Sequence, residues 1–164
     1  MGSRQMTMPA GSRRRLSSAR EYADEAELVS EAVQQLGSRS SRHWGKLQLA
    51  REFFYRSGRT DIIAISSRRL VIAFEAKLAD WRTALHQAHR NRCFAHESYV
   101  LLPERVALRV MNYELEFNRR RVGLCYVSGH RLVRAIQPAV HTPWQEWLVE
   151  SAILAVTRSN IDER

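Results

Sequence analysis

The sequence SGRTDIIAISSRRLVIAFEAK, residues 57–77, decides the fold and the position of the candidate site. Two short apolar runs rich in β-branched residues, 62–65 and 70–74, flank a polar segment at residues 66–69. Apolar runs of this length on either side of a polar turn are typical of an antiparallel hairpin. The sequence therefore predicts two paired strands at the centre of the chain.

Three charged residues lie at the open end of this predicted hairpin. If the turn is centred near Arg68, Asp61 lies opposite or nearly opposite Glu75. Glu75 and Lys77 are two residues apart, so on a strand their side chains share a face. The pattern predicts that two carboxylates and an ammonium group converge at one end of a two-stranded ribbon.

Carboxylates at this separation repel each other unless a cation lies between them. Their hard oxygen atoms suit Mg²⁺ or Mn²⁺. Such an ion can activate a water molecule, orient a phosphodiester and stabilise the charge that develops on it, with help from a neighbouring ammonium group. The residue types indicate metal-assisted phosphodiester hydrolysis. The same residues also fit a solvated cluster of ion pairs at a strand end.

The pattern resembles the PD-(D/E)XK nuclease superfamily, which has the restriction-endonuclease-like fold. The resemblance covers residues 25–127 in the expected order of elements. Thr60 stands where the family name has proline, at a position that varies widely within the superfamily. The residues that carry the resemblance are Asp61 in GRTDIIAI, Glu75 and Lys77 in VIAFEAKL, and Gln87 in ALHQAHRNRCFA, which precedes the predicted strand SYVLLP.

The resemblance implies a Mg²⁺-dependent or Mn²⁺-dependent nuclease, with DNA favoured over RNA as the substrate. It implies that one or two ions are held by Asp61, Glu75 and the carbonyl group of Ala76. Lys77 is then expected to assist the attacking water.

Other site residues follow from the same resemblance. A glutamate on the first helix often reaches the metal in this superfamily, and Glu25 is the candidate, with Glu27 in reserve. Gln87 is expected to arrange the site or the substrate. Glu52, on the predicted first strand, is a further carboxylate that either approaches the ion or faces solvent.

The formal net charge of +9 comes mainly from arginine, because Lys46 and Lys77 are the only lysines among 26 basic residues. Arginine makes bidentate contacts with phosphate, so a polyanionic partner is expected. A general preference for arginine over lysine in the proteome explains the same excess. The candidate nucleic-acid contacts are Arg82, His86 and Arg90 on one predicted helix and Arg42 in a polar loop.

A chain of 164 residues is the size of one domain. We expect a disordered basic arm at residues 1–20, a single nuclease-like domain at 21–158 and a tail at 159–164. The expected fold is α/β, with a restriction-endonuclease-like mixed central sheet flanked by helices: an αβββαβ core, then a strand pair and a helix. Helices are expected at residues 21–36, 80–95, 104–118 and 142–157, and further strands at 47–55, 98–102, 122–127 and 131–136.

The last predicted helix carries several large apolar residues that we expect in the core. It begins at Thr142 and Pro143, which form a typical helix start. The residues expected in the core are Trp144, Trp147, Leu148 and Leu154.

The sequence also predicts the compartment. Cys93 and Cys125 lack metal-ligand spacing and are expected to be buried, reduced thiols of a cytoplasmic protein. Neither a membrane-spanning run nor a secretory signal is recognisable.

Two further functional readings stay open. The chain can be a non-catalytic nucleic-acid-binding module, or an interaction subunit of a restriction or repair complex built on the same fold. In each case the expected role is DNA repair or defence, and a homodimer or larger complex is possible.

Overall fold

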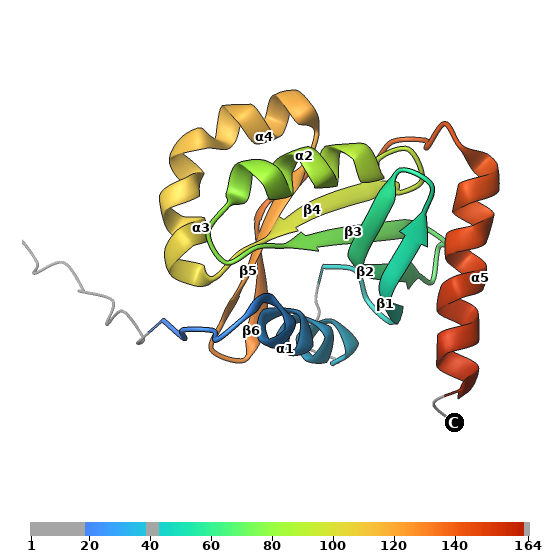
Figure 1. Ribbon diagram of the computed structural model, residues 1–164, viewed down its shortest axis with the longest axis horizontal. Helices are drawn as coiled ribbons and strands as arrows, with labels where there is room; N and C mark the ends of the chain where they lie inside the picture. Colours follow the sequence, from blue (N-terminus) through green and yellow to red (C-terminus); the bar gives the residue numbers. More distant parts are fainter. Residues whose placement is uncertain (1–18, 39–42, 163–164) are drawn as a thin grey trace, which may run out of the picture.

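A mixed six-stranded sheet forms the centre of the computed structural model, which describes residues 19–38 and 43–162 (Figure 1). The strands lie in sequence order across the sheet. The first three and the last two pair antiparallel, whereas β3, β4 and β5 run parallel. The strands are β1 (Leu47–Tyr55), β2 (Gly58–Ser66), β3 (Val71–Ala76), β4 (Glu97–Leu101), β5 (Gly123–Ser128) and β6 (Arg131–Ile136).

Helices cover both faces of this sheet (Figure 1). One face packs against α1 (Glu25–Gly37), and α2 (Trp81–Asn91) crosses the other face between β3 and β4. Further along that second face, α5 (Glu146–Asp162) packs against β1 and β2. The short helices α3 (Glu104–Val110) and α4 (Glu114–Arg120) complete this layer beside α2. The α/β class with a mixed, helix-flanked sheet is therefore confirmed.

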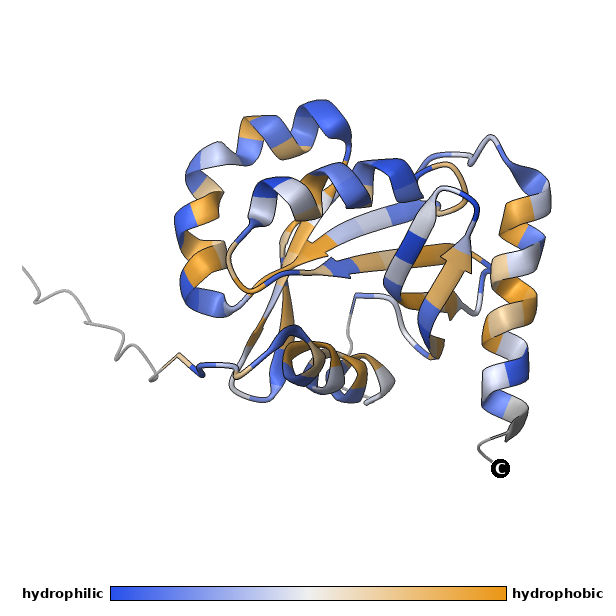
Figure 2. Cartoon of the chain, viewed as in Figure 1, coloured by the Kyte–Doolittle hydropathy of each residue, from blue (hydrophilic) through white to orange (hydrophobic). Residues whose placement is uncertain are grey.

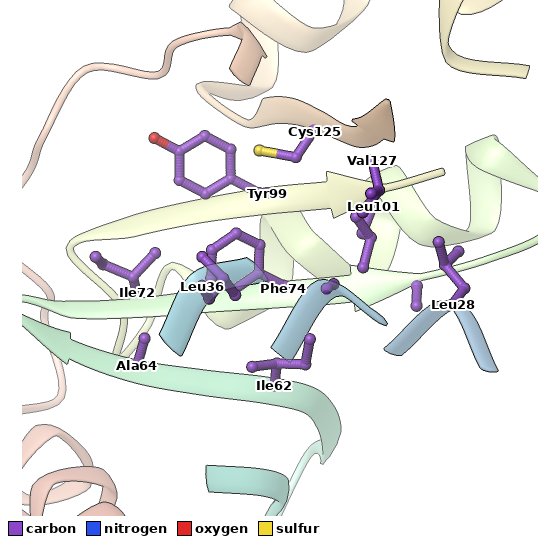
Figure 3. Packing of buried hydrophobic residues seen from close by; sticks show 12 residues of the cluster. Leu28, Leu36, Ile62, Ala64, Ile72, Phe74, Tyr99, Leu101, Cys125 and Val127 are labelled. Carbon is purple, nitrogen blue, oxygen red and sulfur yellow. The ribbon is translucent and has the colours of Figure 1, made fainter. Parts of the chain in front are cut away.

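The position of α1 follows from its capping residue and its apolar stripe. The side chain of Asp24 accepts a hydrogen bond of 2.8 Å from the backbone N–H of Glu27, which fixes the start of the helix. Leu28, Ala32 and Leu36 recur at four-residue spacing and are buried against the sheet. Figure 3 shows this packing, with Leu28 and Leu36 beside side chains from β2, β3 and β4.

The central hairpin agrees with the prediction. β2 and β3 are antiparallel, and the turn between them includes a hydrogen bond of 2.9 Å from the N–H of Arg69 to the carbonyl of Ser66. In Figure 2, β3 is largely hydrophobic, as expected for a strand with covered faces. The predicted strands β1, β4, β5 and β6 are also present, within one residue of their expected bounds.

Three expectations for the helices are wrong. The predicted helix at residues 104–118 is broken into α3, a 3₁₀ turn (Met111–Tyr113) and α4. α5 starts at Glu146 and runs through most of the predicted tail. Of the four apolar residues that we expected in the core, only Leu148 is buried, because α5 packs through the Leu148, Ala152 and Val156 stripe. The exposed residues that we expected in the core are Trp144, Trp147 and Leu154.

The predicted basic arm lies outside the described residues, apart from Ala19 and Arg20. Arg20 is not free, because its guanidinium group pairs with Glu27 at 2.7 Å and with Glu31 at 3.3 Å. Cys93 and Cys125 are both free and buried, as predicted. No helix among the described residues is long and apolar enough to cross a membrane.

Gly123 provides a test of the packing between β4 and β5. A Cβ atom at this position would overlap the ring of Tyr99 and would lie 2.7 Å from the carbonyl oxygen of Ile136. We expect Gly123→Ala to lower the free energy of unfolding by about 1–3 kcal/mol, because both neighbours are held in the sheet. Urea unfolding measures the change. The control is Gly37→Ala, where the new methyl group meets Leu49 at an ordinary 3.6 Å and stability should change little. Equal stability of the two variants would contradict this packing.

Candidate functional site

The centre of the candidate site is the carboxyl group of Glu75 near the end of β3. Its side chain is 2% exposed, and its Oε1 atom accepts a hydrogen bond of 2.5 Å from Nδ2 of Asn91 in α2. The pKa of Glu75 is raised from the ordinary 4.5 to about 7, chiefly by burial and to a lesser extent by the charge of Asp61. The hydrogen bond from Asn91 opposes these effects by stabilising the ionised carboxylate.

A chain of hydrogen bonds orients Asn91 toward Glu75. The hydroxyl group of Tyr55 donates to Oδ1 of Asn91 at 2.6 Å, so the amide nitrogen is left to face Glu75 and Thr60. This nitrogen also donates to Oγ1 of Thr60 at 3.1 Å, and Thr60 donates to the carbonyl of Phe74 at 3.3 Å. Thr60 is thus a buried part of the network.

Asn91 is a residue that our sequence reasoning missed. A signal was present, because Asn91 follows Gln87 by four residues and therefore lies on the same side of the helix. The amide oxygen of Gln87 is buried and has no hydrogen-bond partner among the described residues. Buried acceptors are normally paired, so Gln87 has capacity for a further contact beside this network.

Asp61 lies next to Glu75, as the hairpin register predicts. The paired part of β2 and β3 ends at Ile62 and Phe74, one position before the two acids. Beyond this point the Oδ2 atom of Asp61 accepts a hydrogen bond of 2.8 Å from the backbone N–H of Ala76. This contact fixes the orientation of the Asp61 carboxylate at the strand end.

Lys77 takes a different direction from the predicted one. It follows the last residue of β3, and its Nζ atom lies 2.8 Å from Oε2 of Glu25 in α1. Glu75 is bound to α2 on the opposite face of the sheet, so the expectation that Glu75 and Lys77 share a face is wrong. Strand alternation no longer applies once the strand has ended. Lys77 is still close enough to lower the pKa of Glu75.

The two first-helix candidates are separated by their contacts. Glu25 reaches the site through Lys77. Glu27 turns away from it, because its carboxylate accepts hydrogen bonds from Arg20 at 2.7 Å and from the N–H of Ala23 at 2.9 Å. Glu25 is therefore the first-helix carboxylate that the structure places at the site.

Two carboxylates at the site are of the kind that binds a divalent cation. No three His, Cys, Asp or Glu residues within 19–38 and 43–162 form a group that could hold a metal. Mg²⁺, however, is commonly bound by one or two carboxylates and completes its coordination with water and substrate phosphates. Asp61 and Glu75 supply such a pair, with the backbone of Ala76 beside them, whereas Glu25 is occupied by Lys77.

A pocket of about 300 Å³ opens next to Asp61, between α1 and the strands β1 and β2. Our sequence analysis did not single out Arg51 or Arg59, which line it together with Glu52. Arg59 pairs with Glu52 at 3.2 Å and lies 3.7 Å from Asp61. The sequence places Arg51 and Arg59 on strands near Asp61, but this placement alone does not distinguish them from the other arginines.

The predicted nucleic-acid contacts on α2 are exposed. Arg82, His86 and Arg90 follow each other at four-residue spacing and form one stripe along the helix. The guanidinium group of Arg82 lies 4.1 Å from the ring centre of Trp81 and 3.6 Å from the carboxylate of Glu116. Arg42 lies outside the described residues.

Comparison with known proteins supports the fold. No protein-family model matches the chain, and no curated protein matches it. A solved structure of a protein of unknown function from Silicibacter pomeroyi is similar, with a TM-score of 0.62 and 9% sequence identity. The match covers 86% of this chain and 90% of that one. At this identity the similarity extends to the fold alone.

The buried carboxyl group of Glu75 predicts a specific dependence of stability on pH. Because its folded-state pKa is about 7, above the ordinary 4.5, the folded state retains a proton that the unfolded state loses between these values. The free energy of unfolding should therefore fall as the pH rises through this range, by at most about 3 kcal/mol from Glu75. Glu75→Gln should remove this part of the fall. Urea unfolding across the range, with chelator present, measures it.

The matched control for this measurement is Glu150→Gln, which alters an exposed glutamate of α5. It should retain the pH dependence of the wild type. The account of Glu75 fails if Glu75→Gln and the wild type lose stability in parallel as the pH rises.

Proposed function

We propose that this chain is a metal-dependent nuclease of the PD-(D/E)XK type, with a restriction-endonuclease-like fold, that hydrolyses phosphodiester bonds in DNA. The observation that carries the proposal is the buried carboxyl group of Glu75 beside Asp61 at the end of a central strand, with Lys77 directly after it. Burying one acid next to another is costly, and a functional site is a common reason for such an arrangement.

In this proposal, Asp61 and Glu75 bind Mg²⁺ or Mn²⁺ through their carboxylate oxygens. The bound ion supplies Lewis acidity toward the phosphate and makes a coordinated water more acidic. Metal ligands must be deprotonated, so the hydrogen bond from Asn91 favours the ionised form of Glu75, which is the form that binds metal. The hydrogen bond from Ala76 to Asp61 holds the second ligand in a fixed orientation.

Lys77 stabilises the negative charge that develops on the phosphate or positions the attacking water. The carboxylate of Glu25, at 2.8 Å, pairs with the ammonium group and directs it to this end of the sheet. Gln87 supports the site from α2 in this proposal, because it lies one turn before Asn91 and its buried amide oxygen has no hydrogen-bond partner among the described residues.

Nucleic acid is the partner that fits the charge of the chain. Arg82, His86 and Arg90 form an exposed stripe on α2, and the whole chain carries a net charge of +9. Arginine side chains bind backbone phosphates and release counterions, so the binding should weaken as salt increases.

The alternative function is a non-catalytic nucleic-acid-binding or interaction subunit on the same fold. Three observations favour it: Glu25 is paired with Lys77, Asp61 has Arg59 nearby, and no three-residue metal-binding group occurs in the described part of the chain. A site closed by its own ion pairs would bind DNA without cutting it.

Cleavage of DNA tests the proposal directly. Supercoiled, linear and single-stranded DNA are incubated with the protein in Mg²⁺, Mn²⁺, Ca²⁺ or chelator. We expect cleavage in Mg²⁺ or Mn²⁺ that falls on the order of a hundredfold or more in Asp61→Asn and in Lys77→Met, because each removes a charge that acts on the reacting phosphate. RNA incubated in parallel tests the substrate class.

The matched control is Lys46→Met, which removes the other lysine at an exposed position outside the site. It should cleave like the wild type, and thermal unfolding should show that all variants are folded. Cleavage that persists in Asp61→Asn or Lys77→Met would assign the activity to a contaminant. Salt-sensitive DNA binding without cleavage by the wild type would establish the alternative function.

A further inference from the structure

Arg59 lies beside Asp61, the carboxylate that the proposed metal site requires. Its Nη2 atom is 3.7 Å from Oδ1 of Asp61, and its Nη1 atom is 3.2 Å from Oε1 of Glu52. The other oxygen of Asp61, Oδ2, is held by the N–H of Ala76. The oxygen of Asp61 that accepts no hydrogen bond from the backbone of Ala76 is therefore the one that faces Arg59.

The backbone of β1 contributes to this arrangement. Glu52 has a φ angle of 55°, in the left-handed region that non-glycine residues rarely adopt. Residues held in such conformations occur preferentially at functional sites, where the surrounding structure maintains them. Here the conformation occurs at the carboxylate that shares Arg59 with Asp61.

The contacts of Arg59 are weak enough to exchange. The side chains of Arg59 and Glu52 are 50% and 58% exposed. Ion pairs between solvent-exposed side chains contribute little stability. A guanidinium group competes poorly with a divalent ion for a carboxylate oxygen, because the ion carries twice the charge in a smaller volume. A metal ion bound at Asp61 would also repel the cationic side chain.

The neighbouring pocket offers Arg59 a second position. It measures about 300 Å³, is lined by Arg51 as well as Arg59, and has Asp61 in its wall. This volume is at the lower end of the range for ligand sites and suits a unit the size of a nucleotide. A phosphate group entering it would meet two guanidinium groups, each able to make bidentate hydrogen bonds.

We propose that Arg59 exchanges partners: it pairs with Asp61 and Glu52 in the metal-free protein, and it binds a phosphate group of the nucleic acid once a divalent ion occupies Asp61. Arg59 is then a positioning residue that couples metal binding to substrate binding. This inference rests on the proposed function, because it takes the metal and the phosphodiester from it.

The exchange predicts opposite effects of one substitution on two ligands. Arg59→Ala should bind Mn²⁺ several-fold more tightly than the wild type, because the competing cation is gone. It should bind a fluorescein-labelled DNA about tenfold more weakly in Ca²⁺, and almost unchanged in chelator, where Arg59 is engaged with the carboxylates. Titration calorimetry measures the first effect and fluorescence anisotropy the second.

Two further variants make the test specific. Arg68→Ala removes one exposed arginine at the other end of the hairpin and should change neither affinity beyond its effect on net charge. Arg59→Lys keeps the charge but loses the planar fork, so it should restore Mn²⁺ affinity to the wild-type value and DNA binding only in part.

The inference is overturned if Arg59→Ala leaves the Mn²⁺ affinity unchanged or weakens it, or if DNA binding falls equally with and without the divalent ion. If the wild type binds Mn²⁺ and cleaves DNA but Arg59→Ala does not change the two affinities as expected, the role of Arg59 is refuted and the proposed function is retained. A wild type that binds no Mn²⁺ would refute the proposed function and this inference together.

Discussion

The carboxyl group of Glu75 is the constraint on which the arrangement of the site depends. It is buried in a sheet covered on both faces, where a carboxylate without partners would be very unfavourable. The chain meets this requirement with side chains from three other elements: Asn91 from α2, Thr60 from β2 and, through Asn91, Tyr55 from β1. The hydrogen bond between Asn91 and Glu75 thus links the position of α2 on the second face to the position of this carboxyl group.

The same strand end brings the two faces of the sheet into one site. Glu75 makes its contacts toward α2, while Lys77, two residues later, pairs with Glu25 of α1. The strand ends between them, and the separation of β2 from β3 leaves the N–H of Ala76 to bind Asp61. Polar groups of helices on opposite faces of the sheet, Asn91 of α2 and Glu25 of α1, therefore meet at this strand end, which is where the proposed chemistry is located.

Much of this fold could be predicted from local sequence patterns. The hairpin followed from two apolar runs around a polar turn, and the parallel pairing of β3 with β4 followed from the helix between them. Proximity of Asp61 to Glu75 followed from the register alone. Patterns of this kind succeed because each depends on neighbours along the chain or on a hairpin that fixes its own register.

The remaining features depend on packing between distant elements, which periodicity does not specify. Trp144 and Trp147 are exposed because α5 packs through a different stripe, and both stripes are apolar. The role of Asn91 was missed because a polar residue near a helix end is ordinary until a buried acid is found opposite it. Likewise, the sequence does not distinguish Arg59 from the other arginines; its position is informative only because a pocket and two carboxylates surround it.

The central claim is that Asp61 and Glu75 together form a divalent cation site at the end of β3. A crystal structure of the protein grown with Mn²⁺, with anomalous scattering recorded for manganese, tests this claim most directly. The account predicts an anomalous peak within coordination distance of a carboxylate oxygen from each of the two residues, with Arg59 displaced from Asp61. A protein that crystallises with no peak at this position, or with manganese bound only elsewhere, would contradict it.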